Sequence, residues 1–145
     1  MEDKELEIIM GFPRVFHLFM QKMMRGFETS QEMSLNPTQR RTLLVIHHKK
    51  VLTMTALHQI IGLEKGSLTA VIDQLIGKNL VKRKRDEKDR RRVNISLSET
   101  GNKKVKILRV EIAGHIRKNM EILPLEDRER FYWAVESLID ISRKL

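Results

Sequence analysis

Lys82–Arg92, with the sequence KRKRDEKDRRR, holds more than half of the net charge of this 145-residue chain. Eight of its residues are Lys or Arg and three are acidic, which gives 8 − 3 = +5 of the formal +9. Leu80-Val81 precedes it, and Val93–Leu97 alternates strictly between apolar and polar residues, as half-buried strands do. With Asp86–Asp89 as a turn, the segment predicts a β-hairpin with a basic tip in solvent. A plain solvated loop is the alternative.

Two short helices joined by a tight turn are predicted before the hairpin. Thr55–Ile61 has helical character, and Gly62 stops that helix. The next helix opens around Glu64–Ser67 and ends near Gly77–Asn79. Its apolar residues recur at i, i+3, i+4 and i+7, on one helical face: Leu68, Val71, Ile72 and Leu75. Two such helices form a helix-turn-helix, and the basic hairpin directly after them makes it a winged helix.

Longer helices are predicted before the winged helix. About Glu5–Glu28 carries a wide apolar stripe, in which Pro13 either kinks the helix or begins it. The stripe is wider than one core covers, so it could pack against a second copy of the chain. Asn36 is a suitable cap for a second helix over Pro37–His48, and Val51–Thr53 follows as a short strand.

Two further helices are predicted after the hairpin. Ser98 is a good cap for a helix over Glu99–Met120. Pro124 begins the last helix, and its inward stripe is predicted to comprise Phe131, Val135, Leu138, Ile141 and Leu145. Both ends of the chain are thus expected to be helical and rich in apolar surface.

Composition narrows the class of protein. The length fits one domain, and 41% hydrophobic with 32% charged residues is globular composition. The sequence pI of about 10.0 favours a polyphosphate partner, with an anionic membrane as the second choice. The absence of cysteine excludes disulfides, thiolate metal sites and thiol redox sensing. Neither a signal peptide nor a run of about 18–20 apolar residues is found, so we expect a soluble cytoplasmic protein.

The order of these elements and the wing motif resemble the MarR family of bacterial transcriptional regulators. The family pattern is D-x-R, five residues, then L-T. Here Asp89-Arg90-Arg91 is followed, after five residues, by Leu97-Ser98, with Ser in place of Thr. Val71–Leu75 followed by Lys78–Val81 is similar to the exit of the family's recognition helix. The resemblance covers nearly the whole chain.

The resemblance implies a mostly α fold with a small β-wing, in which long N- and C-terminal dimerisation helices flank a winged helix-turn-helix. One MarR-type domain is expected over residues 1–145, with a DNA-binding lobe at 36–98 and a helical dimerisation lobe at 1–30 and 99–145. The implied function is that of a homodimeric transcriptional regulator bound to a pseudo-palindromic operator in double-stranded DNA. By the resemblance, the regulator is expected to act as a repressor.

In such a fold the second helix of the helix-turn-helix enters the major groove by its N-terminal half. The candidate DNA contacts on its polar face are Lys65, Ser67, Thr69 and Ala70. Lys65 can reach guanine acceptors or a phosphate, and the two hydroxyls can donate to a phosphate or a base edge. Ala70 can touch a thymine methyl group. The helix resembles that of the SlyA-like members, but those members place Arg where Ala70 stands. Not all of their base contacts are therefore expected here.

The wing has a different expected role. By the resemblance, Arg91, alone or with Arg90, inserts into the minor groove, where narrow A·T tracts attract guanidinium groups. Asp89 has the wrong charge for DNA and is expected to pair with an Arg and fix its direction. Further candidates for phosphate contacts, which supply affinity rather than sequence choice, are Arg83, Lys84, Arg85 and Arg92.

An effector, an enzymatic activity and non-specific binding are the other functions to consider beside specific DNA binding. Family members often respond to small aromatic or anionic ligands, so such an effector is a candidate partner. Phe16, His17 and Met20 could line its pocket, although such residues more often belong to a core. No Gly-rich phosphate loop, nucleophile elbow or catalytic triad is found, so no enzyme is expected. The alternative function is non-specific architectural DNA binding, or a winged-helix module that binds another protein.

Five histidines raise the question of a metal site. His47-His48 point about 100° apart on a helix and chelate poorly together. Glu111 and His115, spaced i, i+4, can bind zinc. Zinc-sensing relatives, however, carry their ligands early in the second helix, where Arg40-Arg41 stands here. We therefore expect no metal and no cofactor.

Overall fold

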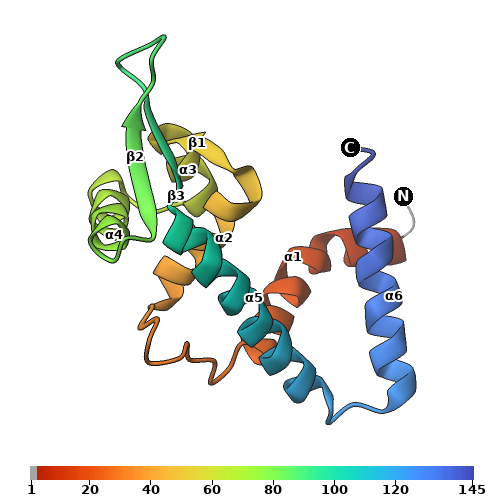
Figure 1. Ribbon diagram of the computed structural model, residues 1–145. Helices are drawn as coiled ribbons and strands as arrows, with labels where there is room; N and C mark the ends of the chain where they lie inside the picture. Colours follow the sequence, from red (N-terminus) through yellow and green to blue (C-terminus); the bar gives the residue numbers. More distant parts are fainter. Residues whose placement is uncertain (1–2) are drawn as a thin grey trace. The chain divides into compact units, whose positions relative to one another are not determined.

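The predicted helix-turn-helix and basic hairpin are both present in the computed structural model, which describes residues 3–145 (Figure 1). Three antiparallel strands form a small sheet, and the rest of the regular structure is helical. The elements follow in the order α1 (Asp3–Met23), α2 (Pro37–Lys49), β1 (Val51–Thr53), α3 (Met54–Ile61), α4 (Lys65–Gly77), β2 (Val81–Arg85), β3 (Val93–Leu97), α5 (Glu99–Met120) and α6 (Leu125–Ser142).

The described chain divides into two compact units. One comprises Glu28–Glu111, and the other comprises the residues up to Phe27 together with Ile112–Leu145. The helix-turn-helix and the hairpin lie wholly within the first of these, which we call the winged-helix unit. The predicted DNA-binding lobe at 36–98 falls inside it, and the unit extends further to include the loop before α2 and the first part of α5.

Side-chain caps set the limits of the helix-turn-helix. The Thr53 hydroxyl accepts a hydrogen bond from the Ala56 N–H at 3.2 Å, which begins α3. Gly62 ends α3 with a φ of 76°, the left-handed conformation that glycine adopts without steric cost. Leu68 and Ile72 are buried on one face of α4, as their spacing predicted. The tight turn between the two helices is therefore confirmed.

Helix α2 begins with a capping box at the residues that the sequence indicated. The Asn36 side chain accepts from the Gln39 N–H at 2.9 Å, and the Gln39 side chain accepts from the Asn36 N–H at 3.1 Å. Gln39 is buried and also donates to the Gln74 side chain at 2.8 Å. One residue thus caps α2 and links it to α4.

The sheet has the strand order β1-β3-β2. Arg83 of β2 lies opposite Ile95 of β3, and Lys82 lies opposite Ser96. Because side chains alternate along a strand, Lys82 points away from the face that carries Arg83 and the buried Ile95. The hairpin prediction is confirmed, together with the short strand at Val51–Thr53.

A close approach of two backbones joins the hairpin to α5. The Ser98 hydroxyl accepts from the Gly101 N–H at 2.8 Å and donates to the Asn79 carbonyl at 2.6 Å. The Ser98 N–H donates to the Leu80 carbonyl at 3.0 Å. A Cβ atom on Gly101 would lie 1.9 Å from the Leu80 carbonyl oxygen. The predicted Ser98 cap is therefore confirmed, and only glycine fits the first turn of α5 at this contact.

The N-terminal helix ends earlier than the sequence predicted. Pro13 lies inside α1, so the helix does not begin at it (Figure 1). The helix ends at Met23 rather than near Glu28, because the chain turns at Gly26, which has a φ of 73°. Phe27, just after this turn, is buried.

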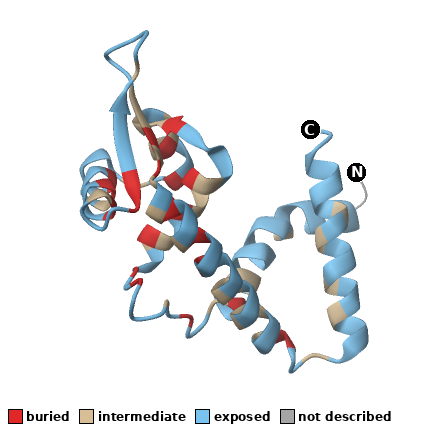
Figure 2. Ribbon diagram, in the orientation of Figure 1, coloured by how far each residue is buried: buried red, intermediate tan, exposed pale blue. Residues whose placement is uncertain are grey.

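The inward stripe predicted for α6 is wrong for the single chain. Leu138 is 46% exposed and Ile141 is 52% exposed, and Leu145, beyond the end of the helix, is fully exposed. Figure 2 shows the contrast, since buried residues mark the winged-helix unit while α6 has none. The first two residues of the stripe, Phe131 and Val135, are half-buried, and Phe131 stacks on Phe19 with ring centroids 4.9 Å apart. None of the helices in the described part of the chain has the length and apolarity that crossing a membrane requires.

We predict that Gly101→Ala destabilises the protein by about 1–3 kcal/mol or more, because the new methyl group would overlap the Leu80 carbonyl and force the backbones apart. The free energy of unfolding would be measured by urea denaturation at a fixed protein concentration.

Gly114→Ala is the matched control, since it lies on the same helix and a Cβ atom there meets nothing within 4 Å. Alanine is the better helix former by up to about 1 kcal/mol, so this variant should be as stable as the wild type or slightly more stable. Equal stability of both variants would contradict the close approach at Leu80.

Candidate nucleic-acid interface

One face of α4 is polar and open to solvent, because the opposite face is buried in the winged-helix unit. The four residues predicted to contact DNA are all exposed on it: Lys65, Ser67, Thr69 and Ala70. The Thr69 hydroxyl donates to the Lys65 carbonyl at 2.9 Å, so its proton is in use while its oxygen remains an acceptor. The Lys65 ammonium group makes no ion pair with any residue in the described part of the chain.

Arg83 connects the base of the wing to α4. Its guanidinium Nη2 lies 2.9 Å from the Asp73 carboxylate in an exposed ion pair. An exposed pair of this kind contributes about 0–1 kcal/mol, so Arg83 can exchange Asp73 for another anion at little cost. Sequence reasoning did not pair Asp73 with Arg83, because the contact depends on how the hairpin packs on the helix.

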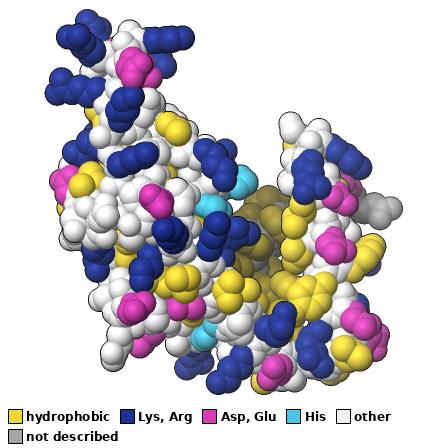
Figure 3. Space-filling model, in the orientation of Figure 1, with side chains coloured by type: hydrophobic (Ala, Val, Ile, Leu, Met, Phe, Trp, Pro, Cys, Tyr) yellow, Lys and Arg dark blue, Asp and Glu magenta, His cyan; other side chains and the backbone are white. Residues whose placement is uncertain are grey.

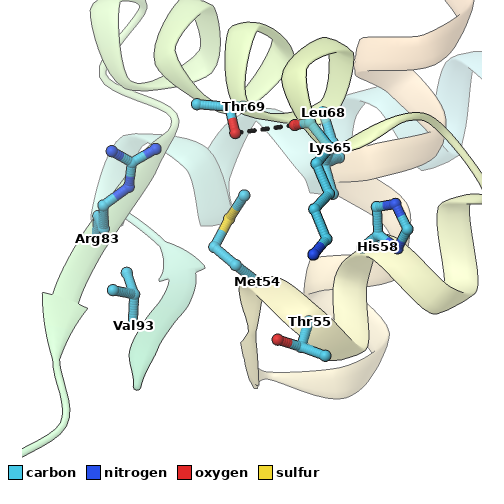
Figure 4. A pocket seen from close by; sticks show the side chains of 8 residues that line it. All are labelled: Met54, Thr55, His58, Lys65, Leu68, Thr69, Arg83 and Val93. Carbon is cyan, nitrogen blue, oxygen red and sulfur yellow. Dashed lines mark hydrogen bonds between the residues drawn. The ribbon is translucent and has the colours of Figure 1, made fainter. Parts of the chain in front are cut away.

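A pocket of about 430 Å³ lies between α3, α4 and the wing. Its apolar lining includes Met54, Leu68 and Val93, and the cationic side chains of Lys65 and Arg83 lie on opposite sides of it (Figure 4). Other lining residues are Thr55, His58 and Thr69. Thr55 and His58 of α3 were not predicted as site residues, since nothing in their sequence distinguishes them from ordinary helix positions. The three elements thus form one groove with cationic groups on two sides.

The tip of the wing is organised by Asp86. Its carboxylate accepts from the Lys88 N–H at 2.8 Å, from the Asp89 N–H at 3.0 Å and from the Asn94 side chain at 3.1 Å. These hydrogen bonds, that from Asp89 above all, lower the pKa of Asp86 below its usual value. Sequence reasoning treated Asp86 only as part of a turn. Its place at the start of the turn was the available signal, because Asp side chains often bind backbone N–H groups two or three residues ahead.

Asp89 lies beside the arginines that follow it. One carboxylate oxygen accepts from the Arg91 N–H at 3.0 Å, and the other lies 3.5 Å from the Arg92 Nε. The carboxylate therefore holds the backbone of Arg91 and the side chain of Arg92. Its expected role in directing an arginine toward DNA stays a prediction.

Several cations of the wing remain without an acidic partner. Within residues 3–145, Arg85, Arg90 and Arg91 form no ion pair, and all three are exposed. Lys84, in contrast, lies 2.6 Å from Glu87, whose hydrogen bond raises the pKa of the ammonium group. Figure 3 shows Lys and Arg side chains gathered at the wing end of the winged-helix unit. This surface attracts an anion along most of its length.

The histidines do not form a metal centre in the part of the chain that the structure describes. No group of three His, Asp or Glu side chains is placed to hold an ion there. His115 of the Glu111–His115 pair instead lies 3.0 Å from the Arg25 carbonyl.

We predict that Asp86→Ala loosens the wing tip, because three donors lose their common acceptor. In NMR spectra, the amide signals of Lys88 and Asp89 should shift toward random-coil positions and exchange faster with solvent. In the wild-type protein the lowered pKa keeps the Asp86 carboxylate charged as acid is added. The tip should therefore stay ordered down to the unperturbed carboxyl range, and it should loosen as pH falls through the lower pKa of the folded state.

Glu87→Ala is the control for this prediction. Glu87 is the neighbouring tip acid, and its partner is the exposed Lys84 rather than the backbone. Its loss should leave the amide signals of Lys88 and Asp89 nearly unchanged. Similar spectra for the two variants would mean that Asp86 does not organise the tip.

The central segment of the chain is similar to a known protein family. Residues 35–93 match the model of the MarR family. This match spans α2 to the start of β3 and confirms the predicted resemblance there. A comparison with curated protein sequences gives no match.

Solved structures confirm the predicted fold class. A cysteine-to-serine mutant of MarR from E. coli is similar with a TM-score of 0.75 at 18% identity, covering 88% of this chain and 95% of that chain. The same mutant complexed with operator DNA is similar with a TM-score of 0.62 at 18% sequence identity. The match covers 91% of this chain and 96% of that chain. A MepR-like protein complexed with pseudoligands is similar with a TM-score of 0.56 at 27% sequence identity. The match covers 97% of this chain and 94% of that chain. The closer likeness of the recognition helix to SlyA stays a prediction.

Proposed function

We propose that this chain, whose residues 35–93 form a MarR family segment, is a transcriptional regulator that binds a pseudo-palindromic operator in double-stranded DNA as a homodimer. The observation that carries the proposal is the open polar face of α4 beside a wing in which Arg85, Arg90 and Arg91 form no ion pair within residues 3–145. The operator complex of the E. coli MarR mutant, which has a similar fold, supports the same reading.

The two parts of this surface have separate tasks. The N-terminal half of α4 enters the major groove, where Lys65 reaches guanine acceptors or a phosphate, and Ser67 and Thr69 accept or donate hydrogen bonds. The tip of the wing inserts Arg91, alone or with Arg90, into the minor groove. The remaining basic side chains, Arg83, Lys84, Arg85 and Arg92, bind phosphates and supply salt-dependent affinity. For Arg83, this requires exchange of the Asp73 carboxylate for a DNA phosphate.

The homodimer is proposed from the apolar surface outside the winged-helix unit. Helix α1 exposes Ile9 at 54%, Phe12 at 51% and Val15 at 64%, and α6 exposes Trp133 at 72% and Leu138 at 46%. A monomer in water rarely leaves so much apolar surface open, and a second copy of the chain would cover it. A two-fold dimer then presents two recognition helices about 34–36 Å apart, one turn of DNA.

The proposals of repression and of a small-molecule effector depend on the resemblance to the MarR family. We propose repression, released by a small aromatic or anionic ligand. The groove between α3, α4 and the wing supports this, because its apolar lining and its cations Lys65 and Arg83 suit such a ligand. A ligand there would occupy groups that DNA also needs. The MepR-like neighbour complexed with pseudoligands is a related case.

The first test is DNA binding by fluorescence anisotropy. The upstream intergenic DNA of the protein's own gene would be compared with scrambled DNA of equal length at two salt concentrations. A specific regulator should prefer the upstream DNA to the scrambled DNA by about 10³-fold or more, and the preference should survive at the higher salt. Equal binding to both, lost together as salt rises, would favour non-specific architectural binding instead, and a scan of other promoters would complete that test.

We predict that Arg91→Ala weakens specific DNA binding by about 1–3 kcal/mol and reduces the preference over scrambled DNA, because a minor-groove contact is lost. Lys84→Ala should weaken binding to both DNAs about equally and lower the salt slope by about one, as the loss of a phosphate contact does.

Both variants should keep the circular dichroism spectrum of the wild type, since both side chains are exposed. Arg130→Ala on α6, whose side chain pairs with Asp127, is the control and should bind DNA normally. Normal DNA binding by a folded Arg91→Ala protein would refute the assignment of the wing tip.

We predict that Phe12→Glu produces a monomer, because it places a charge within the exposed apolar face of α1. Analytical ultracentrifugation would measure the mass in solution. Gln21→Glu introduces the same charge at an exposed polar position of the same helix and should leave the dimer intact. A wild-type protein that sediments as a monomer at micromolar concentration would overturn the dimer proposal.

A further inference from the structure

A second pocket of about 270 Å³ lies at the base of the sheet, apart from the groove beside α4. It is lined by His47 and Lys50 at the end of α2, by Lys82 and Ser96 of the hairpin, and by Asn102 of α5. Because side chains alternate along the strands, Lys82 and Ser96 point away from the face that carries Arg83 and the α3–α4 groove. The two pockets are therefore separate sites in the winged-helix unit.

The charges around the second pocket are of one sign. Burial lowers the pKa of His47, and so do the positive charges of Lys50, Arg109, His48 and Lys106. No carboxylate is among the groups that act on this ring. Neither Lys50 nor Lys82 forms an ion pair with any residue in the described part of the chain. Two lysines and no carboxylate thus line the pocket among the described residues, an arrangement that favours an anion.

The hydrogen bonding of His47 gives independent support. Its Nε2 lies 3.3 Å from the Arg109 Nη1. Arginine has no acceptor, so Nε2 must be the acceptor and the neutral ring must carry its proton on Nδ1. That Nδ1 is buried, and it has no hydrogen-bond partner among the described residues. A buried donor without an acceptor is costly, and a turn of the ring that gave Nδ1 an acceptor on a ligand would offset the loss of the Arg109 contact.

We propose that this pocket binds a small phosphate-type dianion, either inorganic phosphate or the phosphate group of a small metabolite. Lys50 and Lys82 supply charge-assisted hydrogen bonds from two sides. The Ser96 hydroxyl and the His47 ring supply further donors. Asn102 donates one amide hydrogen to the Ser98 carbonyl at 3.0 Å and keeps the other for the ligand. The site goes beyond the proposed DNA contacts, and its occupancy does not depend on them.

The test is an NMR titration of the full-length protein with inorganic phosphate, with sodium chloride added to keep ionic strength constant. We expect a saturable shift of the His47 ring signals and a higher pKa of His47 in the bound state, because an adjacent dianion favours the protonated ring. Lys50→Gln and Lys82→Gln should each raise the Kd for phosphate about tenfold, as the loss of a charge-assisted hydrogen bond does.

Lys103→Gln is the matched control. Lys103 lies next to Asn102 on α5, pairs with the exposed Glu99 and does not line the pocket, so its loss removes the same charge without touching the site. A shift that does not saturate, or a Kd raised equally by all three variants, would overturn the site and indicate general screening of a basic surface.

A titration with a DNA duplex distinguishes binding of a small phosphate ligand from binding of the DNA backbone. If DNA alone shifts the His47 signals and prevents phosphate from doing so, the pocket belongs to the DNA footprint and the small-ligand site is overturned. If phosphate still shifts His47 when the protein is saturated with DNA, the separate site is supported. Failure of DNA to bind at all would bear on the proposed function only, because the phosphate titration is read independently.

Discussion

The contact between Gly101 and the Leu80 carbonyl holds the wing, the recognition helix and α5 in one arrangement. Leu80 follows α4 and begins the hairpin, Ser98 ends the hairpin, and Gly101 lies in the first turn of α5. The Ser98 hydroxyl joins all three, since it donates to the Asn79 carbonyl and accepts from the Gly101 N–H. With both ends of the hairpin held at one point, the wing projects from α4 in a defined direction rather than swinging as a loop.

Charge is distributed along the hairpin in a graded way. At the base, Arg83 is paired with Asp73 of α4, and in the middle Lys84 is paired with Glu87. Toward the tip, Asp86 and Asp89 bind backbone N–H groups and Arg92, while Arg90 and Arg91 are exposed and pair with no acid in the described part of the chain. The acids of the wing therefore shape the loop instead of cancelling its charge. A run of mixed charges becomes a basic tip held by hydrogen bonds, which loses less conformational entropy on binding than an unstructured tail would.

The two units of the chain differ in how far they bury their own apolar residues. The winged-helix unit buries a continuous apolar core that includes Ile46, Leu57 and Ile95, and it is complete within one chain. The other unit leaves much of α1 and α6 exposed, which explains why the inward stripe predicted for α6 is not buried. The spacing of those apolar residues was recognised correctly, but periodicity shows only that a face is apolar. Whether the same chain or a second one covers that face is not encoded in the period.

The sequence by itself determined the local elements of the winged-helix unit. The capping residues Asn36 and Ser98, the stop at Gly62 and the alternation in Val93–Leu97 act over a few residues, so they could be recognised without the fold. The wing motif likewise pointed to the MarR family, whose model residues 35–93 match.

Only the tertiary structure decided which distant groups meet. The pairing of Arg83 with Asp73, the place of Thr55 and His58 in the groove, and the gathering of His47, Lys50 and Lys82 around one pocket all join separate elements. Such contacts depend on how the helices pack and on the register of the sheet. The close approach at Gly101 belongs to the same class, since a glycine near the start of a helix has no local signal until the Leu80 carbonyl is placed beside it.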